Sequence, residues 1–218
     1  MSNTPEIKGK NDIIKEEKLD KINFSCVAFR RSWAFWESYQ GAEGQDYDTL
    51  NKKIYEWDNI IEFFQFWHAY PGSDVSNIFY DGENIKKYFK NEYRINAINI
   101  FVKDVKPMWE DPKNAGGHYL QCEYNKISQS DILKFEAIAT GFWKKLILMT
   151  MGEILPSAEC INGLRFVDKV DFQRGNQIKF RIEIWLSKEI KEEDINKLKE
   201  ELKPISGCED IVIKGISM

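Results

Sequence analysis

The chain has 218 residues, of which 43% are hydrophobic and 30% are charged. This length suits one domain with an attached arm, and the composition is typical of a soluble globular protein. With 31 Lys and Arg against 35 Asp and Glu, the net charge is -4, so the chain lacks the summed positive field that non-specific binding to nucleic acid requires.

The sequence shows no sign of a membrane segment, a targeting segment or a metal site. No apolar stretch reaches the roughly 18 residues that a membrane-spanning helix needs, and the N-terminus resembles no signal peptide. We therefore expect a cytoplasmic protein, with the nucleus as a further location. The four cysteines are widely spaced and only two histidines are present, so we expect free thiols, no metal and no cofactor.

The chain divides into an arm and one domain. Residues 1–23 are predicted to form a disordered N-terminal arm, because they combine many charges with only isolated apolar side chains. Residues 24–218 stay rich in apolar and aromatic side chains, which indicates a single domain. Strands outside the hairpin described below are expected over 24–35, 95–102, 119–124 and 210–215.

The first predicted helix covers 59–70. Asn59 and Glu62 have the spacing of a capping box, which marks its start. Its apolar side chains cover more of the circumference than the usual stripe. We therefore expect part of this surface to face something other than the core.

Two more helices are predicted nearer the C-terminus. Apolar residues at spacings of three and four predict a helix over 130–151 that stops at Gly152. The other covers 191–203 and is predicted to end at Pro204.

A β-hairpin is predicted around Gly175, with strands over 164–173 and 177–186. Apolar and polar side chains alternate along the second strand, which places Arg181 and Trp185 on one charged and aromatic face. This antiparallel hairpin among intermixed helices favours the α+β class.

The turn position also predicts a pair of cations. If the turn is centred near Gly175, Lys169 lies opposite Arg181. Such cross-strand neighbours are close enough to act on one ligand.

A polar loop, rich in Pro and Gly, follows Val102 and contains Trp109 and Glu110. A tryptophan beside a carboxylate in such a loop is typical of a stacking platform whose acid accepts hydrogen bonds from the edge of a base. The alternative is a tryptophan folded back as a lid on the core.

These residues carry a resemblance to a known family. The loop sequence Lys106-Pro107-Met108-Trp109-Glu110-Asp111 resembles the cap-slot loop of the translation initiation factor 4E family, the messenger-RNA cap-binding proteins. The resemblance covers roughly 24–215 and implies a curved, mostly antiparallel sheet with three helices on its convex face. Further blocks match in the same order: Asn114 with Gly116-Gly117, Arg31-Ser32-Trp33-Ala34-Phe35-Trp36, Ile61-Glu62-Phe63-Phe64, Gly152-Glu153 and Arg181-Ile182-Glu183-Ile184-Trp185.

The resemblance implies a cap-binding protein without enzymatic activity. Trp109 would stack on the positively charged 7-methylguanine ring, an attraction of about 2 kcal/mol when desolvated. Glu110 would accept two hydrogen bonds from the guanine edge. Tyr47 would form the opposite wall, where the family usually has tryptophan. The other implied cap contacts are Trp185 at the methyl group, Lys169 and Arg181 at the phosphates, and His118 where many members have arginine.

The resemblance also implies a partner surface on the back of the sheet. There a helix of a 4G-like initiation scaffold or of a 4E-binding protein would dock on Phe64, where the family has tryptophan. The alternative is that Phe64 belongs to the core. The remaining residues of the implied patch are Val27, Trp143, Lys144 and Leu148.

Three alternatives to a translation initiation factor remain open. A cap-binding repressor or storage homologue would bind the cap but not the initiation scaffold. An interaction domain could have lost cap binding altogether. A nucleotide-processing enzyme would need clustered carboxylates or a phosphate-cradling loop, and the sequence has neither P-loop nor metal-ligand spacing. In every case we expect a monomer without membrane contact.

Overall fold

The computed structural model of the protein describes residues 28–40, 47–70, 89–90, 93–127, 132–169 and 178–216. The predicted arm over 1–23, Val27 and the turn around Gly175 lie outside these residues. The division into arm and domain therefore stays a prediction.

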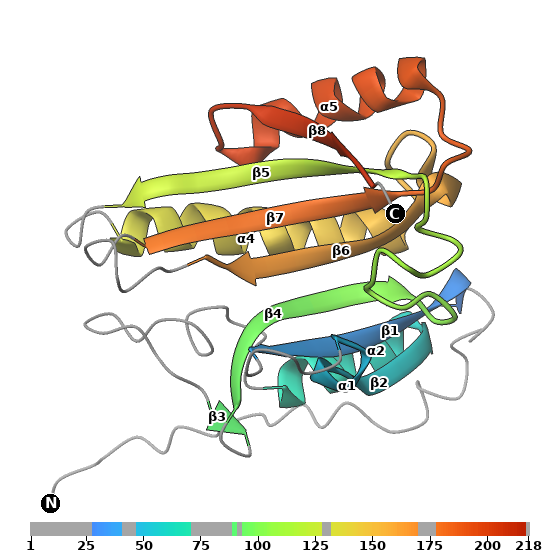
Figure 1. The fold of residues 1–218 in the computed structure, drawn as a ribbon, viewed down its shortest axis with the longest axis vertical. Helices are drawn as coiled ribbons and strands as arrows, with labels where there is room; N and C mark the ends of the chain where they lie inside the picture. The colour runs from blue at the N-terminus through green and yellow to red at the C-terminus, as the bar shows by residue number, and fades with distance from the viewer. Residues whose placement is uncertain are drawn as a thin grey trace, which may run out of the picture.

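One antiparallel sheet forms the centre of the described structure (Figure 1). Its strand order is β2-β1-β4-β6-β7-β5-β8, and β3 pairs with β4. The bounds are Ala28–Gln40 for β1, Asn51–Asn59 for β2, Phe89–Lys90 for β3, Tyr93–Val102 for β4, His118–Ile127 for β5, Ile161–Asp168 for β6, Ile178–Leu186 for β7 and Ile211–Gly215 for β8.

Helices cover one face of this sheet. Figure 1 shows α2 (Ile60–Ala69) behind β1 and β2, and α4 (Ile132–Met151) behind β5, β6 and β7. Side chains of α5 (Glu192–Ser206) join the same hydrophobic core. The short α1 (Tyr47–Leu50) leads into β2, and a 3-10 turn (Ala158–Cys160) leads into β6. The predicted α+β class, with a curved antiparallel sheet and three packed helices, is confirmed.

The opposite face of the sheet, which we name the open face, carries a second and smaller hydrophobic cluster. Alternation along β1 sends Trp33 and Phe35 to the core and Ala34 and Trp36 to the open face. Strand β7 follows the same rule, as predicted. The open-face cluster consists of Ala34, Trp36, Phe101, Val105, Trp185 and Ile216.

The ends of two helices differ in how well the sequence predicted them. The Asn59 side chain accepts a hydrogen bond of 2.9 Å from the Glu62 N–H, so the predicted cap of α2 is confirmed. The predicted end of α5 at Pro204 is wrong, because the helix continues to Ser206. Its last turn is held by the burial of Leu202 and Ser206, and Gly207 then adopts the left-handed φ of 66° that ends a helix.

The predicted register of the hairpin is also wrong. Val167, not Lys169, is the partner of Arg181, and the Lys169 N–H donates to the Lys179 carbonyl at 2.9 Å. The pairing is centred one position before Gly175, and such a displacement shifts every cross-strand pair by two residues. Lys169 therefore lies diagonally to Arg181.

Candidate functional site

The loop between β4 and β5 presents its aromatic and acidic residues to solvent. Trp109 is 51% exposed, and Glu110 is exposed beside it. The alternative of a tryptophan folded back on the core is therefore excluded. Within the described part of the chain, no hydrogen bond or ion pair engages the Glu110 carboxylate.

Two side chains inside the loop fix its shape. The Asp111 carboxylate accepts hydrogen bonds from the N–H groups of Lys106, at 2.8 Å, and Lys113, at 2.9 Å. The fully buried Asn114 amide donates to the carbonyls of Lys106, at 2.9 Å, and Met108, at 2.8 Å. The backbone around Trp109 is thus organised by the loop's own residues.

The same loop is fastened to the sheet. Asn162 on β6 donates to the Lys113 carbonyl at 2.7 Å, and the side chain of Val105 is buried in the open-face cluster. A Cβ atom at Gly117 would lie 2.2 Å from the Leu186 carbonyl oxygen, so only glycine permits this close approach to β7. The backbone that carries the exposed Trp109 is therefore held firmly against the sheet.

Replacing Asn114 by Ala is expected to lower the free energy of unfolding by about 2 kcal/mol, because the buried Asn114 amide no longer donates to the two partly buried loop carbonyls. Urea unfolding monitored by circular dichroism measures this change. Lys113→Ala is the control, since it removes only an exposed side chain. Equal stability of both variants would contradict the assigned role of Asn114.

The second predicted wall of the slot is Tyr47. It is the first residue of α1, and its side chain lies outside the described structure. Its stacking role therefore stays a prediction.

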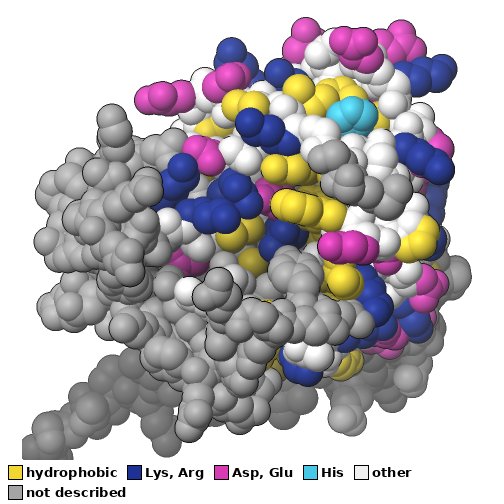
Figure 2. Space-filling view, in the orientation of Figure 1, with side chains coloured by type: hydrophobic (Ala, Val, Ile, Leu, Met, Phe, Trp, Pro, Cys, Tyr) yellow, Lys and Arg dark blue, Asp and Glu magenta, His cyan; other side chains and the backbone are white. Residues whose placement is uncertain are grey.

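Lys and Arg side chains lie close together on the open face, near the end of β6 and the start of β7. We name Lys169, Lys179 and Arg181 the basic cluster; Figure 2 shows Lys and Arg side chains grouped on this side of the molecule. Lys179 lies 3.1 Å from Glu123, and Arg181 lies 2.5 Å from Glu183. Partial loss of hydration, and then the positive charge of Arg181, lower the pKa of Lys169. Among the described residues, Lys169 forms no ion pair.

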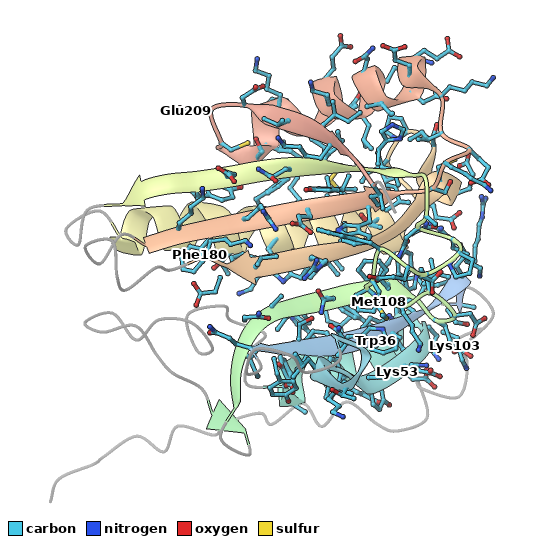
Figure 3. All side chains as sticks on the ribbon, viewed as in Figure 1. Trp36, Lys53, Lys103, Met108, Phe180 and Glu209 are labelled. Carbon is cyan, nitrogen blue, oxygen red and sulfur yellow. The ribbon has the colours of Figure 1, made fainter. Side chains whose placement is uncertain are left out.

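The basic cluster is separated from the loop along the sheet. Arg181 lies four residues before Trp185 on β7, which corresponds to about 13 Å. In Figure 3, Met108 of the loop and Phe180, the chain neighbour of Arg181, lie toward opposite ends of the sheet. A nucleotide with its base at the loop could extend its phosphates along β7 toward the cluster.

The predicted contact of Trp185 with a methyl group does not fit the structure. Trp185 is on the predicted face but is only 1% exposed. Its indole N–H donates to Glu183 at 2.9 Å, Tyr119 stacks on it at 6.0 Å, and Phe101 meets it edge-on at 5.5 Å. These side chains from neighbouring strands cover the ring, so no indole surface is open to a ligand.

The predicted cap contact of His118 stays a prediction. His118 begins β5 opposite Leu186, whereas Arg181 pairs with Glu123 five residues further along. The strand rise puts about 17 Å between these two levels. His118 is thus close to the loop, and the structure does not bring it together with Lys169 and Arg181.

Two buried charged residues were not singled out by the sequence analysis. Arg165 on β6 and Glu183 on β7 are 8% and 1% exposed, and they are cross-strand partners. Their signal was opposite charge at polar positions of two predicted strands. It could not be used, because the register of the hairpin was unknown.

The implied partner surface is present in part. Phe64 is 38% exposed and Leu148 is 43% exposed, so Phe64 is not a core residue. Lys144 is exposed as well. The expectation that Trp143 belongs to this surface is wrong. Trp143 is fully buried and meets Phe166 edge-on at 5.6 Å, because its side of α4 faces the sheet. Val27 lies outside the described residues.

The described residues contain neither a membrane-spanning helix nor a group of side chains arranged to hold a metal. None of the helices there combines the length and apolarity needed to cross a membrane. No group of three or more His, Cys, Asp or Glu side chains in the same residues is arranged to hold a metal ion.

The fold and the site define a class: a single antiparallel sheet with helices on one face, and an exposed aromatic and acidic loop with a basic cluster on the other. The family model described as eukaryotic initiation factor 4E matches residues 28–212. The chain therefore belongs to the eukaryotic initiation factor 4E family.

One matching relative is distant in sequence. Eukaryotic translation initiation factor 4E1 of Drosophila melanogaster is 21% identical over 154 residues, which are 70% of this chain and 48% of the fly protein. The chain thus matches about half the length of that relative.

Solved structures share the fold. A schistosome eIF4E complexed with m7GpppA and 4E-BP has a TM-score of 0.58 and 20% identity, with 87% of each chain covered. Ascaris suum eIF4E-3 in complex with the m7G cap has a TM-score of 0.59 and 17% identity, covering 87% of this chain and 91% of that one. C. elegans eIF4E-3 with the 4E-binding protein Mextli has a TM-score of 0.60 and 14% identity, covering 86% and 92%.

Proposed function

We propose that this chain binds the 7-methylguanosine cap of messenger RNA and acts in translation initiation in the cytoplasm, without enzymatic activity. The observation that carries the proposal is the exposed Trp109-Glu110 pair on a loop that Asp111 and Asn114 hold in shape. Membership of the initiation factor 4E family and the cap complexes of related structures support the same function.

The chemistry of the base fits these two residues. N7-methylation gives guanine a delocalised positive charge, which strengthens its stacking on the electron-rich face of Trp109. Glu110 has no partner among the described residues, so its two oxygens are available to the guanine N1–H and amino group. Tyr47 completes the sandwich in this proposal.

The phosphates are proposed to bind the basic cluster. Arg181 is half-buried and ion-paired with Glu183, and Lys169 is exposed directly after the end of β6. Both can donate to phosphate oxygens while the base occupies the loop. His118 and Trp185 are not needed for this arrangement.

Fluorescence titration with 7-methyl-GTP and with GTP tests the proposal, because Trp109 is an exposed reporter at the site. We expect 7-methyl-GTP to bind at least about tenfold more tightly, a factor that corresponds to about 1.4 of the roughly 2 kcal/mol of cation–π attraction. Equal affinities would contradict the proposed slot. Chromatography of the nucleotide after incubation checks that it is released unchanged, and a reaction product would favour the enzyme alternative.

The exposed patch of Phe64, Lys144 and Leu148 is proposed to dock an amphipathic helix of a partner. Apolar side chains with exposures of 38% and 43% beside a lysine provide the anchors that helix-in-groove recognition uses. A 4G-like scaffold and a 4E-binding protein are both suitable partners, and related structures contain 4E-BP or Mextli.

Phe64→Asp is expected to abolish capture of a 4E-binding-protein peptide, because the charge is placed where an apolar anchor must be desolvated. Isothermal titration with the peptide measures the loss. Val212→Asp is a matched control, since Val212 is 37% exposed on the distant edge strand β8. Wild-type protein that binds 7-methyl-GTP but no helical peptide of a 4G-like scaffold would favour the repressor alternative.

A further inference from the structure

A pair of cysteines lies where α5 connects to β8, away from the proposed binding site. Cys122 on β5 is fully buried in the core and is the cross-strand partner of Ile211 on β8. Cys208 lies in the turn between α5 and β8, shortly before Ile211, and packs against the same core. Figure 3 shows Glu209, the chain neighbour of Cys208, far from the loop between β4 and β5. The fold thus brings together two free thiols that the sequence separates widely.

The two thiols are in contact. The side chains of Cys122 and Cys208 share a hydrogen bond. The Cys208 Sγ also lies 3.1 Å from Ser206 Oγ and 3.3 Å from the Asp210 carbonyl oxygen. The hydroxyl of Tyr124, which lies on the same face of β5 as Cys122, donates to the Ser206 carbonyl at 2.7 Å. These contacts hold the turn that carries Cys208 directly against β5.

The two cysteines differ in access and in acidity. Cys208 is partly exposed, whereas Cys122 is inaccessible to solvent. The hydrogen bond from Cys122, followed by the contact with Ser206, lowers the pKa of Cys208 to about 6 against the effect of burial. The same hydrogen bond, and then burial, raise the pKa of Cys122. Because the thiolate is the form that oxidants attack, Cys208 is the reactive member of the pair and Cys122 keeps its proton.

Cys160 provides a comparison within the same chain. It is also partly exposed, at the end of the 3-10 turn that leads into β6. Burial raises its pKa, so its thiolate form is less populated than that of Cys208. An oxidant that reaches both side chains is therefore expected to react first with Cys208.

We propose that Cys208 and Cys122 form an oxidation site at which hydrogen peroxide converts the two thiols into a disulfide that fastens β8 to the sheet. The Cys208 thiolate attacks one peroxide oxygen, the O–O bond breaks, and the leaving hydroxide takes a proton from solvent. The products are water and the sulfenic acid of Cys208. The Cys122 sulfur then attacks the Cys208 sulfur, the S–O bond breaks, and the hydroxide leaves as water with the Cys122 proton. The thiols lose two electrons to the peroxide, and a thiol such as glutathione reverses the reaction by exchange.

The position of the pair gives the disulfide a physical effect. Strand β8 has five residues, stands at one end of the strand order and pairs with β5. A bond between Cys122 and Cys208 closes a long stretch of chain and so removes conformational freedom from the unfolded state. We therefore expect the oxidised protein to melt about 5 °C or more above the reduced protein.

The test treats the full chain with one equivalent of hydrogen peroxide and maps its tryptic peptides by mass spectrometry. We expect the protein to lose two of its four thiols, with the peptides of Cys122 and Cys208 linked, and dithiothreitol to restore all four. The melting temperature of the oxidised sample is compared with that of the same sample after reduction. Cys160→Ser is the matched control, and it should form the same link with the same rise in melting temperature.

Two variants separate the steps. Cys122→Ala removes the second thiol, so its reaction should stop at the sulfenic acid of Cys208, which dimedone traps. Cys208→Ser changes a partly exposed side chain to one of nearly the same shape, and its peroxide-treated form should show neither the link nor the rise in melting temperature. This second variant keeps the test decisive if Cys122→Ala does not fold. Wild-type protein that keeps four thiols, that links either cysteine to Cys26 or Cys160, or that forms the link without melting at a higher temperature would overturn the proposal.

Discussion

Glu110→Gln is expected to weaken binding of 7-methyl-GTP by at least about a hundredfold, because two charge-assisted hydrogen bonds are lost. Glutamine has nearly the same shape as glutamate but retains only one oxygen. Its amide NH2 group would face the guanine donors, which leaves at least one donor without an acceptor. The stability of the fold should not change, because Glu110 is exposed and has no partner among the described residues.

Retention on immobilised 7-methyl-GTP and fluorescence titration both measure the loss. Glu209→Gln is the matched control, because Glu209 is an exposed carboxylate that Figure 3 shows far from the loop. The control should bind as the wild type does, and both variants should have the same melting temperature. A Glu110→Gln protein with wild-type affinity would rule out the assigned reading of the base edge.

The binding loop could be predicted from sequence because its chemistry is local. Trp109 and Glu110 are adjacent in the sequence. A tryptophan in a polar loop indicates a binding role wherever that loop lies in the fold. The reason for the loop's rigidity was not visible in the same way. Asp111 and Asn114 stabilise it through backbone groups up to eight residues away, and Asn162 contacts it from a different strand.

Two expectations were wrong for the same physical reason: that the Trp185 ring is open to a ligand, and that Lys169 lies opposite Arg181. Alternation along β7 predicts the face on which a side chain lies, and that prediction is confirmed for Trp185. Whether the ring is exposed depends on Arg165 and Tyr119, which come from β6 and β5. Their positions are set by strand order and register, which one sequence does not specify when the turn is not unique.

Strand β2 is a further element that the sequence did not predict. Its residues were not predicted to form a strand, because Lys52, Lys53 and Glu56 obscure the alternation expected of a half-buried strand. Trp57, near the end of the strand, is deeply buried, and its indole N–H donates to the Met151 sulfur at 3.3 Å. Pairing with β1 stabilises a segment whose own propensity is weak.

Trp143→Ala is expected to lower the free energy of unfolding by about 4 kcal/mol, the usual cost of removing a fully buried aromatic side chain. Trp143 is completely inaccessible and packs against Phe166 between α4 and the sheet. Its indole N–H has no acceptor among the described residues, so the loss comes from packing and from the cavity left behind. The variant should still bind 7-methyl-GTP below its lowered melting temperature.

Trp109→Ala is the matched control, since it removes the same side chain from a position that is 51% exposed. Its unfolding free energy should change by less than about 0.5 kcal/mol, as is usual for surface substitutions, while its binding of 7-methyl-GTP is lost. Urea unfolding and cap titration on both variants then separate stability from recognition. The opposite pattern, with a stable Trp143→Ala protein that fails to bind a partner helix, would return Trp143 to the partner surface and contradict its assignment to the core.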